Sequence, residues 1–279
     1  MPIVGLSYSS FSQINLSKNL TKIINCHRLD PNNIGDISSR PSNYFPLGEN
    51  NADILDRSIK QQISCVSSLI LGGGGLLWGN IDETFHELIR IAQGPVVVWG
   101  VGLNHKNMKE EDKWPHWLAE ADLVGVRDIG SNYTWVPCAS CMSSLFDKEY
   151  PATNPIVFYL HHNLSKNWGR ELEHARQPVM YNNVKTMSEA INFIASGQVV
   201  VTTSYHGAYW ATLLGRKVVV AAPQHSRFYF LKHPPVLSGI KDWQKATDKA
   251  VAYPEALAEC RAANVAFYDK VVTLLANID

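Results

Sequence analysis

The sequence predicts an α/β protein with two doubly wound lobes, each built on a parallel sheet. Short apolar runs typical of buried strands alternate with helical patterns, and this alternation favours parallel sheets covered by helices on both faces. The chain has 279 residues and is 46% hydrophobic, which is enough for one large core or two modest ones. Asp147 to Pro155 contains two prolines among polar residues, so we predict a hinge there and lobes over 1–150 and 151–279.

The predicted strands are rich in β-branched residues and end at glycine, proline or asparagine, as buried strands do. They are Ile3 to Leu6, Val66 to Leu71, Val96 to Trp99, Leu123 to Val126, Ile156 to Leu160, Val199 to Thr202 and Val218 to Ala221.

Two helices and one long loop have clear sequence signals. Ser188 as N-cap and Gly197 just past the last turn predict a helix between them. Pro254 to Ala276 carries an apolar stripe that predicts one amphipathic helix, packed on the body and able to cross back to the first lobe. Asn32 to Asn51 is rich in Asn, Ser, Pro and Gly, and predicts a long functional or disordered loop.

Composition excludes several classes of function. Lys plus Arg and Asp plus Glu both number 25, so no global charge attracts nucleic acid or anionic membranes. The N-terminus lacks a secretion signal and no stretch approaches the roughly 18 apolar residues of a transmembrane helix, so we expect a cytoplasmic protein. Five scattered cysteines predict reduced thiols. Cys138 and Cys141 form a C-x-x-C without the further ligands that zinc needs, so we predict no metal.

Glycines and an arginine follow three of the predicted strands. Gly72 to Gly75 follow one strand, where the amides of Gly73 and Gly74 can approach an anion; a tight crossing of two backbones is the alternative. The run lacks the spacing of Rossmann or Walker motifs. Gly100-Val101-Gly102 ends the next strand. Arg127 follows a third, with the forked geometry that grips phosphate or carboxylate; an ion pair with its neighbour Asp128 is the alternative.

The strand over Val199 to Thr202 leads into Thr203-Ser204-Tyr205-His206-Gly207-Ala208 at the start of a helix. A histidine at a helix N-terminus has a lowered pKa and can move protons near neutrality, although a structural histidine is the alternative. Further on, Arg227 and Lys232 lie in an aromatic segment that either clamps an anion or is a solvated loop.

Taken in order, these segments resemble the polysaccharide pyruvyl transferase family. The family carries N-x-G-D, a G-G-G strand end, G-x-G, V-x-V/L-R-D/G and a late histidine after a strand. This chain has Asn33-Ile34-Gly35-Asp36, Gly72 to Gly75, Gly100-Val101-Gly102, Val126-Arg127-Asp128 and Ser204-Tyr205-His206-Gly207-Ala208. Many members have arginine two residues before the histidine, where this chain has Ser204. The S-x-x-H-G-A form resembles the branch that adds pyruvate ketals to exopolysaccharides.

The resemblance implies a GT-B-like fold, with two lobes facing across a cleft, and phosphoenolpyruvate as donor. The acceptor is a sugar of a bacterial polysaccharide or its lipid-linked precursor, and the enzyme works in the cytoplasm or at the inner face of the membrane. Neither metal nor nucleotide cofactor is required. His206 is the expected acid and base, and Asp36 orients or deprotonates an acceptor hydroxyl.

The same resemblance distributes the donor contacts. Arg127 is expected to hold the phosphate or carboxylate, with Arg227 or Lys232 supplying the charge that Ser204 lacks. Ser204 and the helix start near Gly207 add neutral donors.

Two other functions fit the sequence. A GT-B glycosyltransferase that uses a nucleotide sugar would have the same fold, but needs a carboxylate in the second lobe to bind base and ribose. A non-catalytic glycan-binding relative would tolerate the loss of His206.

Overall fold

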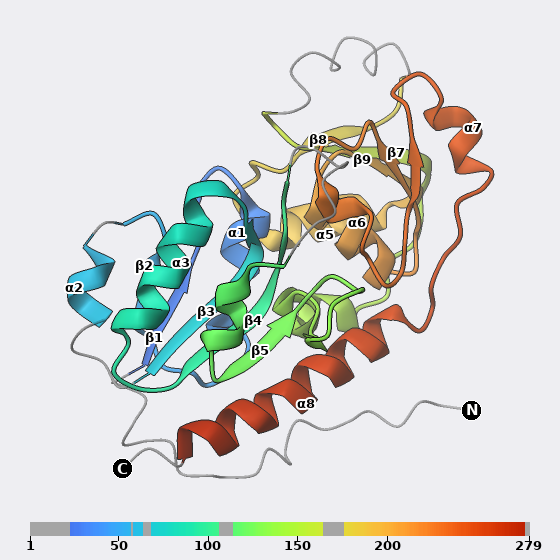
Figure 1. Cartoon of the computed structure of the whole chain (residues 1–279). Coiled ribbons are helices and arrows are strands. Elements are labelled where there is room, and N and C mark those ends of the chain that lie inside the picture. Colours follow the sequence, from blue (N-terminus) through green and yellow to red (C-terminus); the bar gives the residue numbers. More distant parts are fainter. Residues whose placement is uncertain (1–22, 57, 64–67, 106–113, 164–175, 277–279) are drawn as a thin grey trace.

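The computed structural model describes residues 23–56, 58–63, 68–105, 114–163 and 176–276, and contains two parallel sheets with helices packed on them (Figure 1). The predicted α/β class is therefore confirmed. The first sheet has the order β2-β1-β3-β4-β5-β6 and the second β11-β10-β9-β7-β8, and neighbouring strands pair in parallel throughout. The last strand of the first sheet ends at Trp135 and the first strand of the second begins at Asn154.

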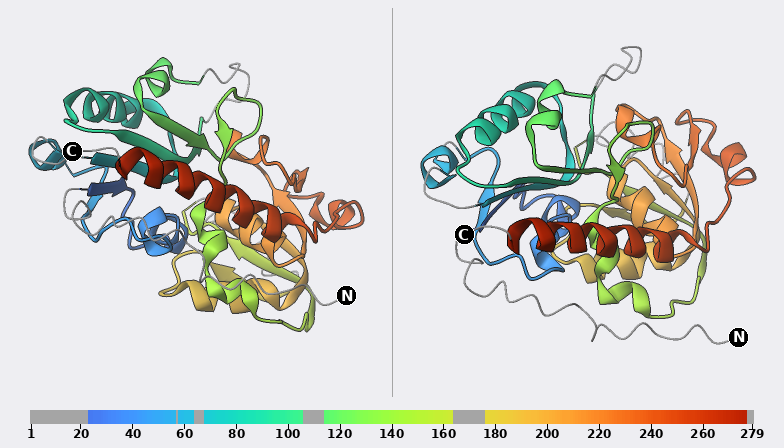
Figure 2. Two further views of the ribbon diagram at one scale, coloured as in Figure 1. Left: turned by 90° about the horizontal axis from the view of Figure 1, so that it is seen from below. Right: turned by 60° about the horizontal axis from the view of Figure 1, so that its bottom comes forward.

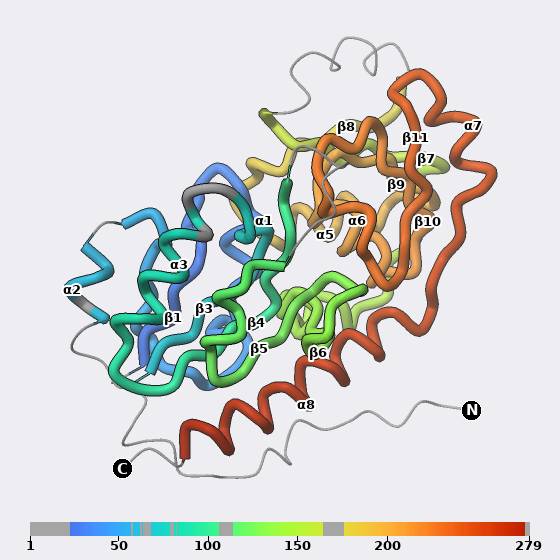
Figure 3. The backbone as a smooth tube through the Cα atoms, viewed as in Figure 1, coloured from blue at the N-terminus to red at the C-terminus, as the bar shows by residue number. Residues whose placement is uncertain are grey.

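The elements follow one another as strands and helices along both lobes (Figure 3). The first lobe contains β1 (Ile23–His27), α1 (Ile34–Ser38), β2 (Asn51–Asp53), α2 (Ile59–Ile63), β3 (Ser68–Leu77), α3 (Gly79–Ile91), β4 (Val96–Leu103), β5 (Leu123–Val126) and β6 (Thr134–Trp135). The rest of the chain contains β7 (Asn154–Leu160), β8 (Val179–Tyr181), α5 (Met187–Ala195), β9 (Gly197–Thr202), α6 (Tyr205–Leu213), β10 (Lys217–Ala221), β11 (Val236–Ser238), α7 (Trp243–Thr247) and α8 (Ala256–Ala276).

Alternate residues of the central strands pack on opposite faces, as the two-residue period of a strand requires. In β7, Val157 and Tyr159 join the core under α5 and α6, whereas Phe158 and Leu160 face Trp243 of α7. Helices therefore cover both faces of the second sheet, which explains why consecutive residues in the central parts of its strands are apolar.

Helix α8 lies across both lobes (Figure 2). On the first lobe, its Asn264 accepts a 3.0 Å hydrogen bond from Nε1 of Trp99, and Phe267 packs edge-on against the same indole. On the second lobe, α8 packs against α6, and between the lobes its Arg261 donates to the carbonyl of Cys141. The predicted C-terminal helix is thus present, and it braces the body of the protein.

Two predicted strands are longer than expected because their glycines stay within the strands. β3 continues through Gly72 to Gly75 as far as Leu77, with Gly73 and Gly74 at φ of +80° and +100°. β4 continues to Leu103 through Gly100, at φ +66°. These left-handed residues accompany shifts in register, so the glycines allow the strands to bend instead of ending them. The predicted strand Ile3 to Leu6 lies outside the described residues.

Two local predictions are wrong. Thr186, not Ser188, caps α5, because its hydroxyl accepts the amide of Glu189. Gly197 does lie just past that helix, as predicted, and it also begins β9. Asn32 to Asn51 is not one long loop: α1 and a 3₁₀ helix at Pro41–Asn43 lie within it. Within the described ranges, no helix combines the length and apolar character needed to cross a bilayer.

Candidate active site

The strand orders show where a ligand site should lie. In open parallel sheets, ligands bind beyond the carboxyl ends of the strands at the point where the strand order reverses. That point lies between β7 and β9 in the second sheet and between β1 and β3 in the first. The segment ending in His206 follows β9, and Asp36 follows β1. Both predicted catalytic residues therefore come from the switch points of their sheets.

His206 lies in the first turn of α6, which begins at Tyr205, two residues earlier than predicted. Ser204 is its N-cap, and its hydroxyl accepts the amide of Gly207 at 3.4 Å. A Cβ on Gly207 would overlap with Thr202 Oγ1, so only glycine lets this turn lie so close to the sheet. The His206 side chain is thereby buried at the lobe interface, and the residue is 5% exposed.

The environment of His206 favours the neutral ring. Burial is the main cause that holds its pKa well below 6.5, and the nearby charges of Arg127 and Arg227 lower the pKa further. The helix N-terminus, on which the sequence argument relied, is therefore not needed to explain a neutral imidazole.

The Asn33-Ile34-Gly35-Asp36 motif joins the first lobe to the second. Oδ1 of Asn33 caps α1 by accepting the amide of Gly35 at 3.2 Å, and it also accepts from Nδ2 of Asn182 at 2.9 Å. Gly35 lies against the imidazole of His206, where a Cβ would overlap with Nδ1. The motif thus brings α1, and with it Asp36, to His206.

Arg127 is buried, with 2% of its surface exposed, in space that two glycines leave open. A Cβ on Gly102 would overlap with Nε of Arg127, and one on Gly75 would lie 3.0 Å from Nη2. The guanidinium stacks 3.7 Å from the centre of the Tyr205 ring. Its Nε lies 3.6 Å from Oδ1 of Asp128, so the ion pair between neighbours, the alternative interpretation, is present.

Arg227 is a second cation at the same place. Its pKa is lowered to about 10, mainly by burial and also by the charge of Arg127, while the charge of Asp36 opposes both effects. Nε of both arginines and Nη2 of Arg127 are buried without a hydrogen-bond partner in the described part of the chain. Burial also raises the pKa of Asp36 to about 6, although both arginines act against it.

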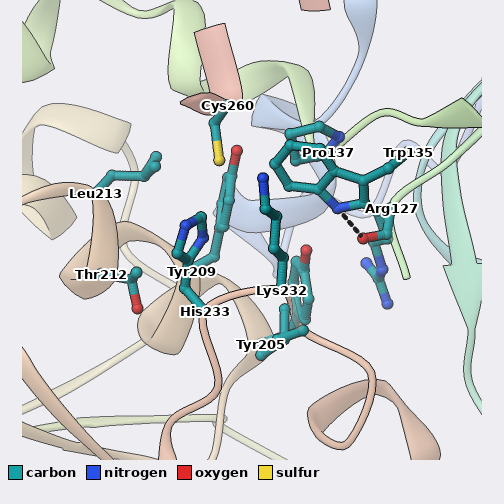
Figure 4. Close-up of a pocket in the computed structure, with 11 residues that line it drawn as sticks. Arg127, Trp135, Pro137, Tyr205, Tyr209, Thr212, Leu213, Lys232, His233 and Cys260 are labelled. Atoms are coloured by element: carbon teal, nitrogen blue, oxygen red, sulfur yellow. Dashed lines mark hydrogen bonds between the residues drawn. The ribbon is translucent and has the colours of Figure 1, made fainter. Parts of the chain in front are cut away.

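Lys232 lies at a pocket beside Arg127 (Figure 4). Its ammonium is 2.9 Å from Oε2 of Glu259 on α8 and 4.4 Å from the centre of the Trp135 ring, and its side chain is 42% exposed. Glu259 therefore already balances its charge, which leaves Arg227 as the cation whose charge is less compensated.

Gly73 makes the close backbone crossing that was the alternative interpretation of its motif. A Cβ there would overlap with the carbonyl of Ser39, which follows α1. For Gly74, the nearest such atom is Oγ of Ser39, at 3.7 Å. Binding of an anion by the amides of Gly73 and Gly74 stays a prediction.

Sequence reasoning missed several residues at this interface. His161 directly follows β7, its amide donates to Oγ1 of Thr203 at 2.8 Å, and burial lowers its pKa to about 4. The strand-end rule that selected His206 would have selected His161 as well. Asn182 and Cys138 gave no comparable signal, because only the packing of the two lobes brings them to the site.

The fold and site define a two-lobed, GT-B-like α/β protein with two arginines and a buried histidine between its lobes. The sequence matches the family model of polysaccharide pyruvyl transferases over residues 15–225, and the chain belongs to this family.

A solved structure shares the architecture at low sequence identity. A putative UDP-N-acetylglucosamine 2-epimerase from Listeria monocytogenes is 10% identical with a TM-score of 0.51, covering 92% of this chain and 93% of that one, and this likeness shows the fold alone. HepE of Anabaena, solved with UDP, is a weaker structural match, 12% identical with a TM-score of 0.47, covering 91% of this chain and 99% of that one. No curated protein is significantly similar in sequence.

Proposed function

We propose that this protein transfers the pyruvyl group of phosphoenolpyruvate to a sugar of a bacterial polysaccharide, or of its lipid-linked precursor, and forms a pyruvate ketal. The observation that carries the proposal is the pair of neighbouring guanidinium groups of Arg127, which is buried, and Arg227, which is partly buried. Asp128 pairs with Arg127, but Nε of both arginines and Nη2 of Arg127 are buried without a hydrogen-bond partner in the described residues, which is unfavourable unless a further anion binds there. Phosphoenolpyruvate offers a phosphate and a carboxylate close together, which suits two forked cations.

The reaction needs no net acid or base. A proton adds to the methylene carbon of the donor, a sugar hydroxyl attacks the adjacent carbon, the C–O bond to phosphate breaks, and a second hydroxyl closes the ketal. Of the two protons that the hydroxyls release, one replaces the proton placed on the new methyl group and the other leaves with phosphate. A histidine that gives and takes a proton at one position is sufficient.

The residues at the lobe interface take separate roles in this scheme. Arg127 and Arg227 bind the anionic groups and stabilise the charge that leaves with phosphate. His206 moves the proton, and Asp36 orients the attacking hydroxyl. Ser204 accepts from Gly207 and keeps its own hydroxyl proton for the donor.

The proposal is tested by thermal-shift and product assays with phosphoenolpyruvate, UDP-sugars and CMP-sugars side by side. Phosphoenolpyruvate at one hundred times its dissociation constant should stabilise the fold by about 2.7 kcal/mol. With a suitable acceptor, phosphate release should accompany a new methyl signal of the ketal in the NMR spectrum. Stabilisation by a nucleotide sugar alone would instead establish the glycosyltransferase alternative.

Asp36 should give the protein a distinctive pH dependence of stability. Because its folded pKa is about 6 against 3.8 normally, the folded state binds more protons between these values, and the free energy of unfolding falls as the pH rises through them. The fall is at most about 3 kcal/mol for a shift of this size. Urea denaturation from about pH 4 to about pH 6.5 should show it, and Asp36→Asn should remove this component. An identical pH profile for both proteins would contradict the burial of an ionisable Asp36.

A further inference from the structure

A chain of buried side chains leads away from His206 on the side opposite Gly35. Nε1 of Trp210 donates to Oγ of Ser140 at 3.0 Å, and the same Oγ lies 3.1 Å from Sγ of Cys138. Sγ in turn lies 3.6 Å from Nε2 of His206. Cys138 and Ser140 come from the segment that follows β6, and Trp210 lies one turn after His206 on α6.

We infer that Cys138 is a positioning residue which, through Ser140 and Trp210, holds the neutral His206 ring as the tautomer with its proton on Nδ1. The role of Cys138 goes beyond the proposed function, in which Cys138 has no part.

The indole of Trp210, at the far end of this series of side chains, fixes the direction of each hydrogen bond. An indole N–H can only donate, so Oγ of Ser140 is the acceptor in that bond. Ser140 is fully buried, and Cys138 is the other partner of its hydroxyl within the described residues, so the hydroxyl proton points to Sγ. The thiol proton is then directed to Nε2 of His206, which makes Nε2 the acceptor.

Burial keeps the Cys138 thiol and the His206 ring in the protonation states that this series of hydrogen bonds requires. It raises the pKa of the Cys138 thiol, so the sulfur retains its proton, and it lowers the pKa of His206, so the ring carries one proton. With Nε2 accepting, that proton is on Nδ1. Nδ1 faces Gly35 of α1 at the lobe interface, and no hydrogen bond in the described part of the chain involves it.

The tautomer determines what Nδ1 can do at the site, a consequence that rests on the proposed function. In the resting ring, the nitrogen at the lobe interface is a donor. Nδ1 can therefore donate a hydrogen bond to a bound anion, but it cannot accept the proton of a sugar hydroxyl while it carries its own proton. Transfer of the Nδ1 proton itself would leave an imidazolate, so the ring gives up a proton only after Nε2 has also been protonated.

The tautomer can be measured without any substrate. Long-range ¹H–¹⁵N NMR spectra of the protein labelled with ¹⁵N-histidine distinguish a proton on Nδ1 from one on Nε2, and His206→Gln identifies the resonances. We expect the Nδ1–H pattern in the wild type at neutral pH. Cys138→Ser, which keeps a donor, should preserve the pattern, and Cys138→Ala should lose it. Cys26→Ala is the matched control, because Cys26 is equally buried but lies in β1.

Several outcomes overturn the inference. An Nε2–H pattern in the wild type, or an unchanged Nδ1–H pattern in Cys138→Ala, would do so. If Cys138→Ala does not fold, Ser140→Ala serves in its place, since it removes the donor that directs the thiol. Binding of phosphoenolpyruvate is measured separately, so failure of the tautomer and failure of the proposed function remain distinguishable.

Discussion

Arg127→Met is expected to weaken binding of phosphoenolpyruvate by about 10- to 100-fold, because a charge-assisted hydrogen bond is worth about 1.5–3 kcal/mol. The guanidinium is held by stacking on Tyr205 and by the ion pair with Asp128, and its Nε and Nη2 have no hydrogen-bond partner in the described part of the chain, so these two donors remain for the ligand. Isothermal titration of the variant and the wild type measures the effect. Arg127→Lys should bind phosphoenolpyruvate with an affinity between those of the wild type and Arg127→Met, since lysine keeps the charge but not the forked geometry.

The matched control for this change is Arg90→Met. Arg90 is an exposed arginine in the last turn of α3, so its loss removes the same charge without touching the lobe interface. We expect the control to bind the donor like the wild type. Unaltered affinity in Arg127→Met would remove Arg127 from the donor site. Loss of affinity in both variants would show a non-specific effect of charge.

His206→Gln is expected to lower kcat by about 10²- to 10⁴-fold, the usual contribution of a general acid or base. The affinity for the donor should change much less, because the two arginines that bind the anion remain. Steady-state phosphate release, with the donor affinity measured in parallel, separates the two effects.

The control for the histidine is His86→Gln on α3, where the ring contacts Glu120 at the surface. It should turn over normally. Wild-type turnover in His206→Gln would contradict a catalytic role for His206. A wild-type chain that binds a glycan without turning over phosphoenolpyruvate would instead support the non-catalytic alternative.

Sequence patterns located the strands well wherever apolar runs were short and β-branched. Leu123 to Val126 has the predicted bounds, and β9 and β10 extend theirs by one or two residues. β1 was missed, because Ile23–His27 contains only three apolar residues, interrupted by Asn25 and followed by His27, although all five are buried. Burial of Asn25 and His27 depends on neighbours from β2 and β3, which a local pattern does not contain.

The glycines show most clearly what a pattern leaves open. Because these glycines follow predicted strands, we expected another group to approach the backbone closely there, and the expected group was an anion. In the structure, Gly102 and Gly75 make room for the guanidinium of Arg127, and Gly35 makes room for His206. A glycine in the sequence indicates that a side chain would not fit at that position. It does not indicate which residue, far away in the sequence, occupies the space.

By itself, the sequence determined the α/β class, the family and the strand ends that carry Arg127 and His206, because local hydrophobic periodicity and ordered motifs record these features. The tertiary structure alone decided that α1 meets α6, that Arg227 lies beside the buried Arg127, that Glu259 balances Lys232, and that Cys138 contacts His206. Each of these is a pairing between lobes or distant segments. Charge compensation, burial and hydrogen-bond direction arise only when such segments pack together. Tertiary packing therefore determines the chemistry of the site.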